Sequence, residues 1–415
     1  MKKFSRKVIT TLLIVTSVLF MSCPGQADSG NTEETKDYFD YSNQNYSVNN
    51  VQGSEDHGCK CYNWDYKTID QSGAVIDCSS FLEYVIPTTS TTKAIDLIVV
   101  DCHGTILSND DAPTNVGASF GANITSKNIL VIAPDYIGYG TSVAKEHPYM
   151  MADLCARTIL DAVLSAIKNA SSFGFSLNPG YQTILCGYSQ GGQTSLATLR
   201  AIQDKIPSEL ASLINVKKCY SGAGPHDLEA TMEVYLYEND WKDYAISPLI
   251  YMVVKGMLSA DYDFLRDYSL SDFMTTEFLN SNLRAAIDEK NTSISDIISS
   301  NTLLTEYYIF RDVTKLLTPA ALDLENPVHK ALKKALSMNK LSSGWTVKKD
   351  LYIFHHQNDD MVPYDNFVNT MAGIGTASCV TGETDTTSYS FGQLDFLHGK
   401  AAGTFYTKII YEINQ

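Results

Sequence analysis

One run of residues, Leu185–Gly192 (Leu-Cys-Gly-Tyr-Ser-Gln-Gly-Gly), places a serine between glycines at the spacing of a nucleophilic turn. The apolar segment Tyr181–Cys186 predicts a short buried strand, and Thr194–Ile202 predicts a helix with one apolar face. The chain must then turn sharply at Ser189, which the small neighbouring glycines allow. Such a strand–serine–helix turn is typical of a serine that acts as a nucleophile in covalent catalysis. The alternative is a chance match in a glycine-rich loop.

A nucleophilic serine needs a histidine as base and a carboxylate that orients it, and in this type of turn both follow the serine along the chain. A predicted strand that ends at His355 is followed by Asp359, the candidate acid. The candidate base is His398, which we expect in a loop ahead of the last helix. Asp360 and Asp227, which follows an earlier strand, compete with Asp359 for the same histidine.

Hydrolysis through an acyl-enzyme also needs two donors for the oxyanion. The backbone N–H of Gln190, at the start of the helix after the serine, supplies one. The other is expected in the loop His103-Gly104-Thr105 after an earlier strand, so Gly104 and Thr105 are candidate oxyanion residues. His103 precedes the serine, so we interpret it as part of this loop and not as the base.

The elements that must position these residues alternate between strand and helix. Two alternating segments around Gln71-Ser72-Gly73 predict a hairpin. Later apolar runs predict buried strands, and Tyr149–Asn169 predicts a helix. The segments expected as strands are Tyr62–Ile69, Val75–Ile86, Ile95–Val100, Ile129–Ala133, Tyr181–Cys186, Val216–Ser221 and Leu351–His355, and Thr404–Ile413 is the expected last helix. The order predicts an α/β fold whose mainly parallel central sheet carries helices on both faces.

Between Leu228 and about Trp345 the pattern changes to helices without a strong strand signal. This segment is rich in aromatic residues: Tyr235, Tyr237, Tyr251, Phe264, Tyr268, Phe273, Phe278, Tyr307, Tyr308 and Phe310. They could pack the small core of an ordinary helical insertion, or shape an apolar substrate pocket beneath a cap. The sequence leaves both interpretations open.

The N-terminus has the pattern of an export signal. Met1–Ser22 begins with cations, continues with an apolar run too short for a comfortable membrane span, and ends before Cys23. We expect Cys23 to carry lipid, and the alternative is ordinary cleavage, for example after Ala27. Residues 23–60 are predicted to be a flexible tether, and 61–415 to be the folded domain, with the helical cap inserted at about 228–345.

Composition excludes some classes of function. The net charge of −16 opposes binding to phosphate backbones, so nucleic acid is not an expected partner. Cys59 and Cys61 lie beside His57 at a spacing that is wrong for a zinc knuckle, and no metal or cofactor is expected. A disulfide among Cys59, Cys61 and Cys78 stays open for an exported chain.

Several blocks of the sequence together resemble the α/β-hydrolase superfamily, and more closely its secretory lipase/esterase branch, which includes bacterial lipoproteins. These blocks are Gly187–Gly191, His103–Thr105, Pro134–Gly140 with His147–Tyr149, Asp359–Pro363, and His398. The resemblance covers the chain from about Ile95 onward. It implies an α/β-hydrolase fold with Ser189 as nucleophile, Asp359 as acid and His398 as base.

The expected function is hydrolysis of carboxylic esters, with an apolar acyl or aromatic group in the substrate, by an exported cell-envelope lipoprotein anchored to the membrane through Cys23. A soluble secreted form is the alternative location. A first alternative function is a serine peptidase like the prolyl oligopeptidases, although the N-terminal part is too short for their propeller. A second is a surface-anchored binding protein on a hydrolase scaffold without activity.

Overall fold

The computed structural model describes residues 36–86, 92–119, 128–237, 249–260, 262–390 and 396–415. The predicted signal peptide and the predicted lipidation site, Cys23, lie outside the described residues. Within the described part of the chain, no helix is long and apolar enough to cross a membrane.

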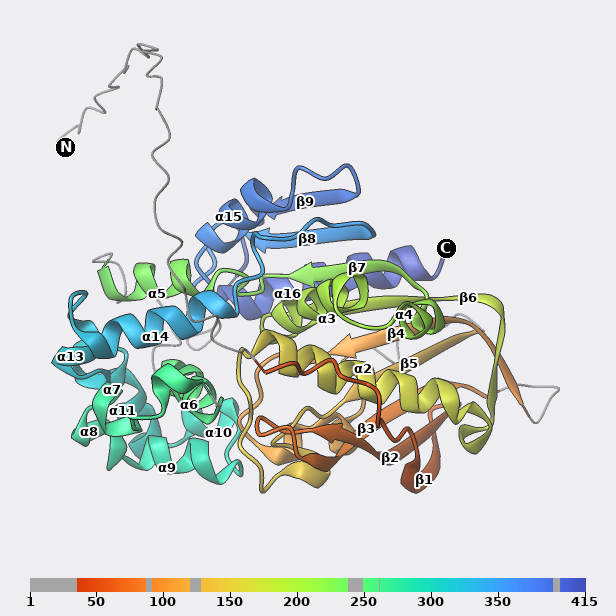
Figure 1. Ribbon diagram of the computed structural model, residues 1–415, viewed down its shortest axis with the longest axis horizontal. Coiled ribbons are helices and arrows are strands. Elements are labelled where there is room, and N and C mark those ends of the chain that lie inside the picture. Colours follow the sequence, from red (N-terminus) through yellow and green to blue (C-terminus); the bar gives the residue numbers. More distant parts are fainter. Residues whose placement is uncertain (1–35, 87–91, 120–127, 238–248, 261, 391–395) are drawn as a thin grey trace, which may run out of the picture. The chain divides into compact units, whose positions relative to one another are not determined.

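The strands of the described residues form one nine-stranded sheet, in the order β1-β2-β3-β5-β4-β6-β7-β8-β9 (Figure 1). Pairing is antiparallel from β1 through β3 to β5, and parallel from β5 through β4 to β9. The prediction of a mainly parallel sheet is confirmed, and so is the hairpin of β2 and β3. The strands are β1 (Val48–Asp56), β2 (Cys59–Ile69), β3 (Val75–Val85), β4 (Lys93–Cys102), β5 (Ile129–Pro134), β6 (Phe175–Tyr188), β7 (Val216–Gly222), β8 (Asp350–His356) and β9 (Val380–Asp385).

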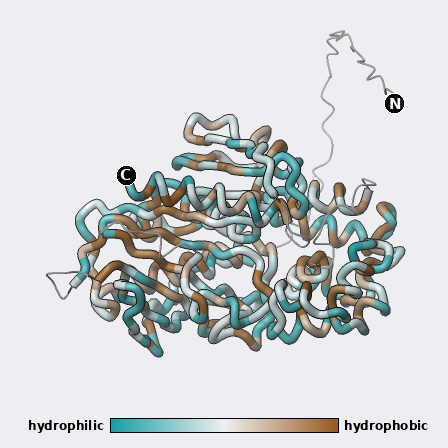
Figure 2. Tube along the Cα trace, turned by 180° about the vertical axis from the view of Figure 1, so that it is seen from behind, coloured by the Kyte–Doolittle hydropathy of each residue, from teal (hydrophilic) through white to brown (hydrophobic). Residues whose placement is uncertain are grey.

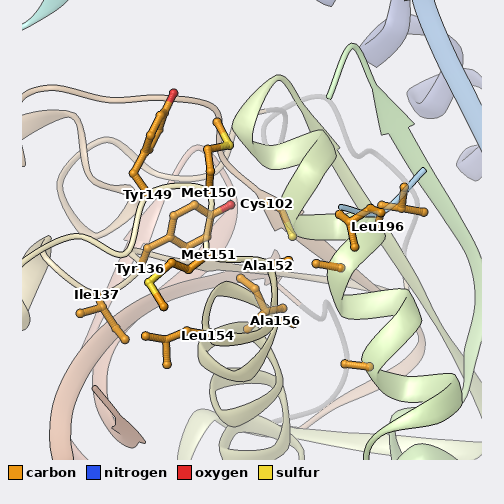
Figure 3. Close-up of a cluster of buried hydrophobic side chains, with 14 of the residues drawn as sticks. Cys102, Tyr136, Ile137, Tyr149, Met150, Met151, Ala152, Leu154, Ala156 and Leu196 are labelled. Atoms are coloured by element: carbon orange, nitrogen blue, oxygen red, sulfur yellow. The ribbon is translucent and has the colours of Figure 1, made fainter. Parts of the chain in front are cut away.

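Helices cover both faces of this sheet. On one face α2 (Ala152–Lys168), α3 (Gln190–Asp204) and α4 (Ser208–Ile214) pack over the larger core cluster, part of which is drawn in Figure 3. On the other face α16 (Leu397–Ile413) buries Phe405 and Ile409 in a second cluster with strand residues. Figure 2 shows apolar residues concentrated along the strands between these layers. The central parallel strands are therefore buried on both faces, as continuous apolar runs predict.

The segment 228–345 is helical in its described part, and Figure 1 shows its helices grouped beside the carboxyl ends of β7 and β8. Several of its aromatic residues pack on one another, since the Phe278 ring lies 5.2 Å from that of Tyr251 and 5.0 Å from that of Phe310, and these three belong to the larger core cluster. The helices are α5 (Leu228–Tyr237), α6 (Ile250–Ser259), α7 (Leu270–Phe273), α8 (Thr276–Leu279), α9 (Asn282–Glu289), α10 (Ile294–Ser299), α11 (Asn301–Phe310), α12 (Val313–Leu316), α13 (Pro319–Leu322) and α14 (Pro327–Met338).

Shorter elements complete the domain. The helix α15 (Asp365–Gly373) connects β8 to β9, and α1 (Pro113–Val116) follows β4. Single 3-10 turns are η1 (Asn109–Asp111), η3 (Gly140–Ser142), η4 (Ala170–Phe173) and η7 (Asp263–Leu265).

The expectation of a flexible tether through residue 60 is wrong for residues 36–60. β1 pairs along β2, and Tyr38 and Phe39 are each only 7% exposed. The buried guanidinium of Arg157 on α2 holds the first part of this segment, because its Nη1 donates to the carbonyl oxygens of Tyr38 at 2.6 Å and Asp40 at 3.1 Å. Its Cζ also lies 3.9 Å from the centre of the Tyr41 ring. Contacts with a residue distant in sequence thus order a segment whose composition is typical of a linker.

Two further differences concern the C-terminal part. β9 and α15 were not predicted, because β9 is largely exposed and lacks an apolar run. The expectation that His398 lies in a loop is wrong, since α16 begins at Leu397 and includes it. Cys59, Cys61 and Cys78 are free thiols in the structure.

Candidate active site

Ser189 occupies a strained turn between β6 and α3. It is the N-cap of α3 with φ 61° and ψ −123°, a backbone conformation that non-glycine residues rarely adopt. Its N–H donates to Gly222 O at 2.9 Å, which ties the turn to β7. A Cβ on Gly187 would lie 2.3 Å from Gly191 O, and one on Gly191 would lie 1.9 Å from Cys102 O. Both glycines are therefore required for the strand and the helix to approach this closely.

His398 and Asp359 form a buried pair at the carboxyl end of the sheet. His398 Nδ1 lies 2.7 Å from Asp359 Oδ2, while Asp359 Oδ1 accepts the N–H groups of Met361 at 2.9 Å and Val362 at 2.8 Å. Burial acts to raise the pKa of Asp359, but the charge and hydrogen bond of His398 outweigh it, so the pKa lies below the ordinary value. Among the described residues, the buried His398 Nε2 has no hydrogen-bond partner. This nitrogen is therefore free to accept a proton.

Asp360 has a different task from its neighbour Asp359. Its Oδ2 accepts the N–H of Leu397 and its Oδ1 that of His398, both at 3.0 Å. These are orphan donors at the N-terminus of α16, where a carboxylate also complements the helix dipole. The adjacent carboxylates thus hold His398 twice, Asp359 through the imidazole and Asp360 through the backbone.

Asp227, the third candidate acid, binds elsewhere. Its Oδ2 lies 2.9 Å from Lys340 Nζ and accepts the hydroxyl of Ser342 at 3.0 Å, and its Oδ1 accepts the N–H of Ala230 at 3.2 Å. These contacts join the start of the helical segment to its end. Of the three carboxylates predicted to compete for His398, Asp359 is the one that contacts the imidazole.

The loop after β4 presents the N–H of Thr105. Burial lowers the pKa of His103, so its neutral ring donates through one nitrogen, and the shorter contact is 2.7 Å from Nδ1 to Gly104 O. In a trans peptide the carbonyl and the following N–H point in opposite directions. The Thr105 N–H therefore points away from His103, and it has no hydrogen-bond partner among the described residues.

The second expected donor is the N–H of Gln190, which as the first residue of α3 has no acceptor within the helix. The Gln190 side chain is directed away, with its Nε2 2.7 Å from His147 Nε2, while His147 Nδ1 donates to Ile137 O at 2.7 Å. Burial lowers the pKa of His147 to about 3, so the ring is neutral and can accept from the amide. The hydrogen bonds through His147 and Ile137 thus fix the side chain of Gln190, the residue that follows Ser189.

Ser189 and His398 line one cavity of about 780 Å³, together with Gly104 and Thr105. Much of the remaining wall is aliphatic or Met side chains from α5, α6, α10 and α14, including Met232, Leu236, Val253, Ile298, Leu332 and Leu336. Of the ten aromatic residues singled out in the helical segment, Tyr235 is the one that lines this cavity in the described structure. Aliphatic residues of the segment thus line the cavity, while Tyr251, Phe273, Phe278 and Phe310 are buried in the larger core cluster.

Sequence reasoning missed two site residues. Asp360 was considered as an acid, and its contact with α16 had no local signal because the helix begins 37 residues later. Tyr149, which lines the cavity, was noted in a sequence block and at the start of a predicted helix, but not as a site residue; it lies just ahead of α2, which begins at Ala152. The described residues contain no cluster of three His, Cys, Asp or Glu side chains able to hold a metal.

No protein-family model and no curated protein matches the sequence. Solved structures are similar in fold. The rice cell wall degrading esterase LipA from Xanthomonas oryzae, in a ligand-bound form, matches with a TM-score of 0.65 and 17% identity, over 88% of this chain and 96% of that chain. The putative hydrolase lpg1103 from Legionella pneumophila matches with a TM-score of 0.67 and 15% identity, over 87% of this chain and 89% of that chain. Candida antarctica lipase A matches with a TM-score of 0.56 and 13% identity, over 83% of this chain and 77% of that chain. The chain has the α/β-hydrolase fold.

Proposed function

We propose that the protein is a serine hydrolase of carboxylic esters. The observation that carries the proposal is the arrangement around His398: Nδ1 is bound to the buried Asp359 carboxylate, and Nε2 is unpartnered beside the cavity that Ser189 also lines. This division of the two ring nitrogens is what a general base acting on a serine needs. The esterase and lipase folds among the similar structures agree with it.

The reaction follows from these positions. Ser189 Oγ attacks the ester carbonyl while His398 Nε2 takes its proton, and Asp359 stabilises the imidazolium. The oxyanion accepts hydrogen bonds from the N–H groups of Gln190 and Thr105. The imidazolium then gives the proton to the leaving alcohol, and water, activated by His398, releases the acid from Ser189.

The lining of the cavity indicates the substrate. Its roof is aliphatic, which suits an acyl chain better than a single aromatic ring, and a cavity of about 780 Å³ has room for one. We therefore place esters with an apolar acyl group first.

Steady-state rates on nitrophenyl esters from acetate to decanoate, together with one peptide nitroanilide, test this function. Ester turnover should be abolished in Ser189→Ala and kept in Ser208→Ala, a change of an exposed serine at the start of α4. Cleavage of the peptide alone would favour the peptidase alternative. Inertness towards both, with no labelling by a fluorophosphonate, would favour the binding protein.

We further propose that the protein is exported and anchored by lipid on Cys23, on the strength of the sequence Ser22-Cys23. Two or more acyl chains are expected, because a single chain binds membranes only marginally. Labelled palmitate should mark the parent and not Cys23→Ala, whereas equal labelling of both would contradict the anchor. Release of the unlabelled parent into the medium would favour the soluble form.

A further inference from the structure

Tyr136, which follows β5, has a strained backbone and a buried side chain. Its φ is 66°, a value that is rare for a bulky residue, and its side chain is only 2% exposed. Figure 3 shows its ring within the buried cluster, with the hydroxyl pointing toward Cys102 at the end of β4. Such strain persists only where the surrounding contacts over-determine the conformation, so the contacts of this ring indicate its task.

The first contacts of Tyr136 are with the loop after β4. Its hydroxyl donates to His103 O at 3.0 Å, and its ring stacks on the His103 imidazole with centroids 3.8 Å apart and planes at 21°. Burial raises the pKa of the phenol well above the ordinary value, so it keeps the proton that it donates. A Cβ on Gly191 would lie 2.9 Å from the same carbonyl oxygen. The His103 carbonyl is therefore held between Tyr136 and the first turn of α3, two residues before the proposed donor Thr105.

The second contact of Tyr136 is with the histidine that holds Gln190. The rings of Tyr136 and His147 are parallel within 6°, with centroids 6.2 Å apart, as in an offset stack. His147 Nε2 lies 2.7 Å from Gln190 Nε2 and fixes that side chain. A Cβ on Gly138 would lie 2.9 Å from the His147 backbone, so the chain after Tyr136 packs directly on this histidine. One ring thus contacts both structures that hold the proposed oxyanion donors.

We propose that Tyr136 is a positioning residue that sets the two oxyanion donors, the N–H groups of Thr105 and Gln190, relative to each other. The inference rests on the proposed ester hydrolysis and adds a residue that does not line the cavity in the described structure. Tyr136 touches no reacting atom and acts through His103 and His147. Donors held in place before the carbonyl becomes tetrahedral need no reorganisation as the oxyanion forms.

Two variants of Tyr136 separate its hydrogen bond from its stacking. Tyr136→Phe keeps the ring and loses the bond to His103 O, so kcat should fall about tenfold with KM within about twofold. Tyr136→Leu loses both, and kcat should fall about 10²-fold, because small misplacements from changes outside the reacting groups have costs of this size. Tyr84→Phe is the matched control, since its hydroxyl, on an equally buried side chain of β3, donates to Phe173 O at 2.7 Å. It should lower the melting temperature about as much as Tyr136→Phe and leave kcat within twofold.

A second readout separates positioning from stability. A trifluoromethyl ketone forms a tetrahedral adduct with the serine, so its inhibition constant should rise in each Tyr136 variant by the factor by which kcat/KM falls. A folded Tyr136→Phe with kcat and inhibition constant within twofold of the wild type overturns the inference, and so does an equal loss of kcat in Tyr84→Phe. If Tyr136→Leu does not fold, the two phenylalanine variants decide in the same way. An inactive wild type that forms no ketone adduct would instead refute the proposed function.

Discussion

Replacing Asp359 with asparagine separates two tasks that its carboxylate performs at once. Oδ1 accepts two backbone N–H groups, from Met361 and Val362, and Oδ2 faces His398 Nδ1 at 2.7 Å. The amide oxygen of an asparagine must take the place of Oδ1, because only it can accept the two N–H groups. The amide NH₂ then faces Nδ1 and donates to it, which leaves the imidazole proton on Nε2.

An imidazole protonated on Nε2 cannot take the proton of Ser189. The wrong tautomer, together with the lost charge beside the imidazolium, should lower kcat by about 10²–10⁴. This loss corresponds to about 3–5 kcal/mol of transition-state stabilisation at 1.36 kcal/mol per decade. The melting temperature should change little, because both backbone hydrogen bonds are kept.

The assay is turnover of a nitrophenyl ester by Asp359→Asn, with thermal melting of the same sample. Asp227→Asn is the matched control, since its carboxylate binds Lys340 and Ser342 and not His398. It should lose stability and keep kcat within about twofold. Near-full turnover in Asp359→Asn would refute the assignment, and a collapse of kcat in a folded Asp227→Asn would move the acid to the strand end after β7.

Three further predictions concern neighbouring features. Asp360→Ala removes both acceptors at the start of α16, so urea melts should show a loss of about 1–2 kcal/mol and kcat should fall several-fold, with partial rescue in Asp360→Asn. Unchanged kcat would show that the hydrogen bonds of Asp360 at the start of α16 do not affect catalysis. Leu336→Trp on α14 fills the cavity, so the rate ratio of decanoate to acetate esters should fall at least tenfold, while an unchanged ratio would place the acyl chain elsewhere. Burial, with the charges of Asp101 and Asp56, raises the pKa of Glu83 to about 7, so its ionisation opposes folding as the pH rises through that value. Urea melts should show Glu83→Gln to be more stable than the wild type at pH 8 and not at pH 4, and an equal difference at both would contradict this.

The parts of the fold that could be predicted are those with a local physical cause. Buried parallel strands need continuous apolar runs, and every such run singled out in the sequence is a strand of the sheet. The turn at Ser189 could be placed because glycines are required where β6 and α3 touch. The contact between His398 and Asp359 could be anticipated from the order of residues after strand ends.

The parts that could not be predicted depend on contacts between distant residues. Residues 38–44 were expected to belong to a linker because their order comes from Arg157, more than a hundred residues away. The start of α16 depends on the carboxylate of Asp360, so the stretch around His398 has no capping residue of its own. Aromatic density in the helical segment indicated a packed core but not which side chains would face the substrate.

Burial explains why three histidines near one serine have different tasks. His103 and His147 are buried and bonded to main-chain carbonyls, and burial lowers the pKa of both, so they stay neutral and serve as fixed donors or acceptors. A charge on either ring would need a counter-ion behind the proposed oxyanion donors, where no carboxylate contacts it in the described structure. His398 differs because Asp359 accepts from one of its nitrogens and the cavity leaves the other unpartnered. In the proposed mechanism, the Asp359 carboxylate thus lies behind the one ring that becomes charged, while the neutral rings of His103 and His147 bind the loops around it.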